Sequence, residues 1–187
     1  VATGWQTALR VRSLPAAGRA YLVQDHEPEF FGTSAQRTRA VESYGYGLYP
    51  ITAGPWLARL MDEHYGLPAT SFDLGINGDR YRPQPQITRR GDVVLAYARW
   101  STPRRAVPVV LAALGELKRR RPRTEVWLFG QGGPIGVDFD HVSHGVLADH
   151  DLPALYAQAT VGLVLSLTNY SLVAQEMLAC GLPCVEL

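Results

Sequence analysis

The sequence predicts an α/β protein built on parallel sheets, and three features of the chain support this fold class. Short apolar, β-prone runs alternate with stretches of helical spacing along most of the chain. Polar side chains gather directly after several of these runs, as they do at the ligand-binding edge of a parallel sheet. An extended segment, Tyr81-Arg-Pro-Gln-Pro85, interrupts the alternation and has the composition of a linker. We therefore expect two domains, at 1–85 and 86–187.

The first domain is expected to alternate strands and helices. The predicted strands are 19–24, 48–52 and 70–75, and the predicted helices are 5–14, 34–44 and 55–65. Pro55 stands at the first helical position, where its missing N–H leaves no hydrogen bond unmade. Gly66 follows the same helix and is typical of a helix C-terminus.

The second domain restarts the alternation. Its predicted strands are 92–98, 125–129, 142–147, 161–167 and 185–187, and its predicted helices are 106–120, 152–159 and 172–180. The run 161–167 is apolar almost throughout, which is typical of a strand covered on both faces. Ser171 is placed as the N-cap of the last helix, and Gly181 with Pro183 indicates where that helix stops.

Composition indicates a globular chain able to bury a core. Of the 187 residues, 47% are hydrophobic and 19% are charged, and the net charge of +1 gives no argument for a nucleic-acid partner. Cys180 and Cys184 are expected to be reduced packing residues. The chain begins with Val1 and ends on a predicted strand with no helix after it to cover that strand. We therefore expect a fragment of a longer protein.

The turn before the last helix is the strongest candidate binding site in the residues themselves. A strand, a polar turn and a helix in succession direct free backbone N–H groups and the positive end of a helix dipole at an anion. Glu176 lies about 7–8 Å along the helix axis from Ser171, at a rise of about 1.5 Å per residue. A carboxylate at that distance suits the hydroxyls of a ribose attached to a diphosphate. The local pattern predicts a nucleotide-diphosphate site.

Two further polar segments follow predicted strands. Arg99 and Arg104 lie in the loop after the strand 92–98, where each can form charge-assisted hydrogen bonds to a phosphate. Arg105 is the less favoured phosphate ligand, and a solvated basic loop is the alternative. The acidic segment 25–29 follows the strand 19–24. It is either a ligand-binding rim or a loop that caps the next helix and keeps it soluble.

Other motifs are set aside. The glycine-rich segment 130–136 lacks the ending of a phosphate-binding P-loop, and the histidines lack the spacing of a zinc site. Asp138 and Asp140 imitate a metal-binding D-x-D pattern but are expected to form a solvated turn, so no metal ligands are predicted. The basic run 118–121 is explained by the dipole of its helix, with an anionic lipid surface as the alternative.

The segment Thr168–Leu187 resembles the nucleotide-sugar segment of the GT-B glycosyltransferases called glycosyl transferase group 1 (family 4, retaining). Glu176 matches the second Glu of the family's E-x7-E pattern, and Ala179-Cys-Gly-Leu-Pro-Cys-Val185 matches its A-x-G-x-P-V tail. The first Glu of the pattern falls at Thr168, so that acid is absent. The rhamnosyltransferase-like branch is similar at Ser166-Leu-Thr-Asn-Tyr-Ser171 and in its Q-D-x-E-P-x-F segment, here Gln24–Phe30.

The resemblance implies a GT-B fold of two Rossmann-like domains, both incomplete. Residues 1–85 would be the C-terminal part of the N-terminal acceptor domain, and 86–187 a C-terminally truncated nucleotide-sugar-binding domain. The residues implied to orient the acceptor or the sugar are Asp25, His26 and Glu27. Those implied to hold the donor diphosphate are Arg99 and Arg104. Those implied to bind the rest of the nucleotide sugar are Gly145, Val146, Asn169, Tyr170, Ser171, Leu172 and Glu176.

The implied activity is metal-independent transfer of a sugar from a nucleotide-diphosphate donor, with retention, in cell-surface polysaccharide synthesis. The sugar is of the hexosyl type, with rhamnose as a candidate, and the acceptor is a glycan or a lipid-linked glycan. No cofactor and no nucleic acid are expected. The implied location is the cytoplasm, with peripheral contact at the inner face of the membrane as an alternative. A nucleotide-sugar epimerase and a non-catalytic nucleotide-binding or interaction fragment are the competing interpretations.

Overall fold

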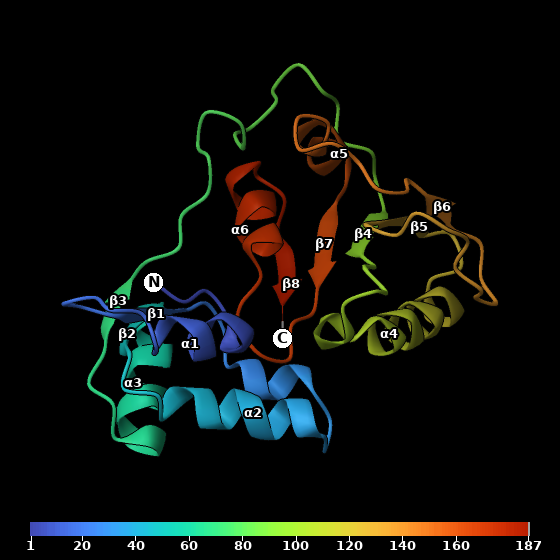
Figure 1. Ribbon diagram of the computed structural model, residues 1–187. Helices are drawn as coiled ribbons and strands as arrows, with labels where there is room; N and C mark the ends of the chain where they lie inside the picture. The colour runs from blue at the N-terminus through green and yellow to red at the C-terminus, as the bar shows by residue number, and fades with distance from the viewer. Residues whose placement is uncertain (187) are drawn as a thin grey trace. The chain divides into compact units, whose positions relative to one another are not determined.

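A computed structural model describes residues 1–186 and shows an α/β protein with two compact units, Val1–Gly75 and Ile76–Leu187 (Figure 1). Leu187, which ends the predicted terminal strand, lies outside the described residues. The division between the units comes earlier than the predicted boundary near residue 85. The reason is that Tyr81 is buried in the hydrophobic core of the second unit, so the segment before Pro85 already belongs to that unit.

The first unit is built on a parallel sheet of order β1-β2-β3. Its strands are β1 (Ala20–Val23), β2 (Tyr49–Ala53) and β3 (Thr70–Phe72). Its helices are α1 (Trp5–Val11), η1 (Glu27–Phe30, a 3-10 turn), α2 (Ala35–Tyr44) and α3 (Pro55–Tyr65). One apolar core joins the strands to the helices, with Tyr21, Leu57 and Met61 among its most buried side chains.

The ends of these helices follow the local sequence. The Ser34 hydroxyl accepts a hydrogen bond from the Arg37 N–H at 3.3 Å and caps α2. Pro55 occupies the first turn of α3, and Gly66 ends that helix in the left-handed conformation at φ 63°. The predicted start and stop of α3 are therefore confirmed.

The second unit is built on a five-stranded parallel sheet of order β6-β5-β4-β7-β8. Its strands are β4 (Val93–Tyr97), β5 (Glu125–Phe129), β6 (Val142–Ser143), β7 (Val161–Val164) and β8 (Cys184–Glu186). Its helices are η2 (Pro103–Arg105, a 3-10 turn), α4 (Val107–Arg120), α5 (Leu152–Gln158) and α6 (Leu172–Ala179).

Helices cover both faces of this second sheet. On one face Leu95, Phe129 and Val164 form a core with residues of α5 and α6, and on the other Ala96 and Leu128 form a core with α4 (Figure 1). Alternate strand residues thus serve opposite faces, as expected for a parallel sheet buried on both sides.

The strand order places a topological switch point between β4 and β7. The chain runs outward from β4 to β5 and β6, then crosses back to lay β7 and β8 on the other side of β4. In open parallel sheets, ligands bind beyond the carboxyl ends of the strands at such a point. The loops after β4 and β7 meet there, because the Leu167 N–H donates to the Arg104 carbonyl at 2.9 Å.

Several predicted elements are shorter in the structure; those predicted at 5–14, 70–75 and 161–167 end at Val11, Phe72 and Val164. For two others the backbone conformation explains the difference. The strand predicted at 142–147 stops at Ser143, because Gly145 turns the chain at φ 66°. The helix predicted from Ala106 starts one residue later, because Ala106 itself is left-handed at φ 46°. Among residues 1–186, no helix combines the length and the apolar character that a membrane span requires.

Candidate functional site

A cavity of about 500 Å³ lies at the carboxyl ends of β4 and β5 in the second unit. Three of the predicted site residues, Arg99, Val146 and Glu176, are in its wall. Its aromatic wall consists of Tyr81, Tyr97, Phe129 and Tyr156. The cavity therefore has a cation and a carboxylate among apolar rings, which is the composition of a small-molecule site.

The glycine-rich segment after β5 shapes the floor of this cavity. Gly130 is left-handed at φ 91°, and a Cβ there would lie 2.5 Å from Cε2 of Tyr97. The Gly130 N–H donates to the Gly145 carbonyl at 2.8 Å, which ties the loop after β5 to the loop after β6. Gly130 is needed because no side chain fits between the loop and the Tyr97 ring.

Glu176 projects from α6 into the cavity between two tyrosines. Its Oε2 accepts a hydrogen bond from the Tyr156 hydroxyl at 3.5 Å, and the Tyr81 phenol lines the same cavity close enough to influence the carboxylate. Burial raises the pKa of Glu176, the two phenols oppose that rise, and Asp149 adds to it. The carboxylate is thus half-buried and hydrogen-bonded on one side while it faces the cavity on the other.

The predicted turn at the start of α6 is built as expected but lies outside the cavity wall. Ser171 caps the helix, since its Oγ accepts from the Val173 N–H at 3.3 Å. The Ser171 N–H donates to Oε1 of Glu186 at 2.9 Å, so one amide predicted to face a diphosphate holds a carboxylate. Of this region, Val173 and Glu176 line the cavity and residues 169–172 do not.

The two predicted phosphate-binding arginines occupy different positions. Arg99 is exposed and lines the cavity. Arg104 lies in η2 outside the cavity wall, and its carbonyl is the acceptor for the Leu167 N–H. The Arg105 guanidinium lies 5.9 Å from the ring centroid of Tyr97, which is itself a cavity residue. Arg105, which the sequence favours less as a phosphate ligand, therefore lies beside a residue of the cavity wall.

In the first unit, Glu27 is fully engaged within the fold. Its carboxylate accepts hydrogen bonds from the Trp5 N–H at 2.8 Å and from the Tyr21 hydroxyl at 3.0 Å. The residue is only 8% exposed, and burial raises its pKa. These contacts join α1 and β1 to the segment after β1, so the carboxylate acts as an internal anchor.

His26 and Asp25 are held by their own neighbours. The His26 Nε2 lies 2.7 Å from the Tyr65 hydroxyl, and its Nδ1 lies 3.6 Å from Oε1 of Glu29. Asp25 is buried, and its Oδ1 accepts from the His26 N–H at 2.8 Å. Burial lowers the pKa of His26, so its imidazole is neutral at neutral pH and oriented by the tyrosine.

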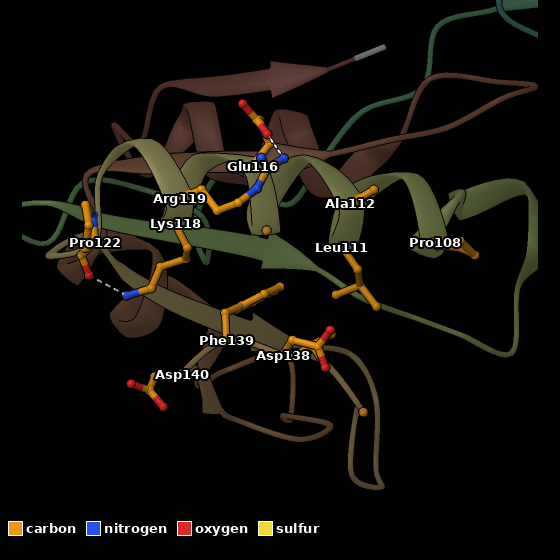
Figure 2. A pocket seen from close by; sticks show the side chains of 13 residues that line it. Pro108, Leu111, Ala112, Glu116, Lys118, Arg119, Pro122, Asp138, Phe139 and Asp140 are labelled. Carbon is orange, nitrogen blue, oxygen red and sulfur yellow. Dashed lines mark hydrogen bonds and ion pairs between the residues drawn. The ribbon is translucent and has the colours of Figure 1, made fainter.

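A larger cavity, of about 860 Å³, lies between α4 and the segment 136–140 (Figure 2). It contains Asp138 and Asp140 but none of the predicted nucleotide-binding residues, and it is away from the carboxyl ends of the strands. Figure 2 shows Phe139 pointing toward α4 and the Lys118 Nζ donating to the Pro122 carbonyl at 2.7 Å. We therefore place the candidate site in the smaller cavity, where the topology directs a ligand.

The basic run at the end of α4 is paired within the second unit. Arg119 and Arg120 both contact the Glu116 carboxylate, and Arg121 lies 3.3 Å from that of Asp92. A lipid contact through this run stays a prediction. Among residues 1–186, no group of three or more His, Cys, Asp or Glu side chains is arranged to hold a metal ion.

The sequence did not single out the aromatic wall of the cavity. The sequence places Tyr81 in a predicted linker, Phe129 in a predicted strand and Tyr156 in a predicted helix, with no binding role for any of them. The signal that could have found them is their position beside turn segments. Phe129 directly precedes the glycine-rich segment, and Tyr81 follows Asn77, which begins a turn.

In sequence, the chain is similar to the O-antigen biosynthesis protein RfbC of Myxococcus xanthus. The two are 34% identical over 192 residues, which cover 99% of this chain and 15% of that protein. The chain thus spans a small part of the length of this relative. No family model matches the chain.

In structure, the chain is similar to two proteins solved with UDP. One is a point mutant of S. aureus TarM, solved with fondaparinux, alpha-GlcNAc-glycerol and UDP, at a TM-score of 0.69 and 9% identity over 90% of this chain and 36% of that one. The other is the pneumococcal O-GlcNAc transferase GtfA, solved with UDP and GlcNAc, at a TM-score of 0.64 and 14% identity over 96% of this chain and 38% of that one. The predicted fold class, an α/β chain of GT-B type with parallel sheets, is confirmed.

Proposed function

We propose that this chain is part of a glycosyltransferase of cell-surface polysaccharide synthesis and that its second unit binds the nucleotide-sugar donor. One observation carries the proposal: Arg99 and Glu176 converge on one cavity at the switch point of a parallel sheet. The similarity to an O-antigen biosynthesis protein and the GT-B type fold support the same assignment.

The donor residues have distinct tasks. Arg99 neutralises charge that builds on the leaving diphosphate, which is the main electrostatic requirement of glycosyl transfer. Arg104 assists from the same loop, and the amides of residues 170–172 assist from the start of α6. Glu176 accepts hydrogen bonds from the ribose, while Val146 and the backbone of Gly145 contact the base. Arg99, Val146 and Glu176 line one cavity, which supports these roles.

The first unit supplies the acceptor side of the reaction. His26 is the residue of its acidic segment best suited to contact a sugar, because its imidazole is neutral and oriented by the Tyr65 hydroxyl at 2.7 Å. Asp25 and Glu27 act mainly by holding the segment in place, as the internal contacts of their carboxylates support.

The finer features of the reaction follow from the family resemblance. They are retention at the anomeric carbon, hexosyl transfer with rhamnose as a candidate sugar, and chemistry without a metal or other cofactor. The partners are a nucleotide sugar and a glycan or lipid-linked acceptor, met in the cytoplasm or at the inner face of the membrane. The presence of UDP in the TarM and GtfA structures supports a nucleotide-diphosphate donor.

Product analysis with a panel of sugar nucleotides tests the proposal. Each donor is incubated with the protein, with and without a glycan or lipid-linked acceptor extract, and products are identified by mass spectrometry and NMR. We expect one donor to release its nucleoside diphosphate and to transfer its sugar with unchanged anomeric configuration. A changed sugar nucleotide formed without an acceptor would instead indicate an epimerase. Binding without transfer or hydrolysis would indicate a non-catalytic nucleotide-binding fragment.

A further inference from the structure

Two phenols converge on the Glu176 carboxylate inside the cavity. Tyr156 comes from α5 and is fully buried, and its hydroxyl lies 3.5 Å from Oε2 of Glu176. Tyr81 comes from the segment before β4, is 6% exposed, and lines the cavity together with Glu176. The two rings are stacked at 6.4 Å between centroids, with 26° between their planes. Three separate elements thus meet at one carboxylate.

Both phenols are permanent hydrogen-bond donors. Burial, and then the nearby Glu176 charge, raise the pKa of Tyr81 to about 12, and the same causes raise that of Tyr156 further. An ionised carboxylate has about four lone-pair positions that accept hydrogen bonds. With one of them taken by the Tyr156 hydroxyl and the Tyr81 phenol stacked beside that ring, at least about two remain for groups in the cavity.

Tyr81 is fixed by a turn although its segment has the composition of a linker. The Tyr81 N–H donates to the Asn77 carbonyl at 2.9 Å, and the Asn77 Oδ1 accepts from the Arg80 N–H at 3.2 Å. The Arg80 guanidinium in turn pairs with Asp149 at 3.1 Å, and Asp149 belongs to the cavity wall. The turn and the ion pair hold Tyr81 in place against the second unit.

We propose that Tyr81 and Tyr156 are positioning residues that aim the Glu176 carboxylate at both hydroxyls of a ribose, so that the site selects ribonucleoside diphosphates over their 2′-deoxy counterparts. This inference rests on the proposed function, in which Glu176 binds the ribose. The physical reason is the count of hydrogen bonds. A 2′-deoxyribose leaves one acceptor position of a half-buried carboxylate without a donor, and hydrogen bonds to charged groups contribute about 1.5–3 kcal/mol.

The test is calorimetric titration of the 187-residue chain with UDP against dUDP and GDP against dGDP. For the base that binds, we expect the ribonucleotide to bind at least about tenfold more tightly than the deoxynucleotide. The same titrations are made on Tyr81→Phe and Tyr156→Phe, which keep the rings and remove the hydroxyls. We expect both to lose ribonucleotide affinity and to reduce the preference to about threefold or less.

The matched control is Tyr46→Phe, which removes a phenol beneath the Arg12 guanidinium in the first unit and should leave the preference unchanged. Thermal unfolding checks that each variant folds. If Tyr156→Phe does not fold, the titration of Tyr81→Phe decides the question. Equal weakening of both nucleotides in the variants, or no preference in the unmodified protein, overturns this inference and leaves the proposed function standing. Absence of binding by all four nucleotides overturns this inference, and absence of binding by dTDP as well overturns the proposed function.

Discussion

The two units place polar residues at the carboxyl ends of parallel strands in the same way but use them differently. After β1, the Glu27 carboxylate receives hydrogen bonds from the Trp5 N–H and the Tyr21 hydroxyl, both within its own unit. Beside the carboxyl ends of β4 and β5, Arg99 and Glu176 face a cavity of about 500 Å³. One carboxylate completes a fold, and the other faces a cavity.

The contrast teaches how to separate structural from binding roles in a polar strand end. Buried polar groups require hydrogen-bond partners, and the question is whether the chain itself supplies all of them. Glu27 has a donor for each carboxylate oxygen, so its pattern needs no ligand. Glu176 accepts a hydrogen bond from the Tyr156 phenol and faces a cavity, which leaves acceptor positions for a ligand.

Removal of the Glu27 carboxylate should have the largest effect and tests its structural role. Glu27→Ala leaves the Tyr21 hydroxyl and the Trp5 N–H without their acceptor in a buried site, so we expect the free energy of unfolding to fall by about 3 kcal/mol. Urea unfolding measures this loss, and Glu27→Gln, which preserves the shape, should lose less. Nucleotide affinity, measured under conditions where the variant is folded, should not change. A stable Glu27→Ala protein would show that the carboxylate is not an anchor.

The opposite result is expected at Arg99. Because this side chain is exposed and lines the cavity, Arg99→Ala should leave the unfolding midpoint unchanged and lower donor turnover by about 100-fold. Arg123→Ala, which removes an exposed arginine remote from the cavity wall, is the matched control. Arg104→Ala should have a smaller effect than Arg99→Ala. Normal turnover in both Arg99→Ala and Arg104→Ala would contradict the proposed role of the loop after β4.

The sequence was sufficient for most of the fold but only for part of the site. Pro55, Gly66 and Ser171 mark helix ends by local chemistry, and the structure has these ends where they were predicted. The cavity wall could not be read in the same way, because it forms only when distant elements pack together. Tyr81 and Glu176 are far apart in sequence, and nothing local to either indicates that a phenol meets the carboxylate. The structural role of Glu27 was equally hidden, because the donors to its carboxylate lie on α1 and β1.

The raised pKa of Glu176 predicts a pH-dependent difference in stability between the unmodified protein and Glu176→Gln. Because burial raises its pKa, the folded chain holds this proton more tightly than the unfolded chain, whose carboxyl titrates near 4.5. The free energy of unfolding therefore falls as the pH rises from about that value through the raised pKa. Glu176→Gln lacks this loss, so it should unfold at a higher temperature than the unmodified protein at neutral pH. The two midpoints should approach each other as the pH drops below 4.5. Thermal scans across this range would show parallel curves if the carboxyl were unperturbed.

The smallest expected effect concerns the start of α6. The Glu186 carboxylate accepts the Ser171 N–H at 2.9 Å, which is one of the amides proposed to assist the diphosphate. Glu186→Gln removes that negative charge, so we expect the affinity for a nucleoside diphosphate to rise by about threefold. Calorimetry with the diphosphate and with the matching nucleoside separates the effect on phosphate binding from any effect on the nucleoside, whose affinity should not change. Equal gains for both ligands would exclude a phosphate-specific effect.

Calorimetric titration of UDP, GDP and dTDP into the unmodified protein and into Glu176→Ala tests the central claim most directly. That claim is that the cavity beside β4 and β5 binds a nucleoside diphosphate through Glu176. We predict that one nucleotide binds clearly more tightly than the others. We also predict that Glu176→Ala weakens this binding by about tenfold or more, as expected for lost hydrogen bonds to a charged group. Binding of equal strength to both proteins, or no binding of any nucleotide to the unmodified protein, would contradict it.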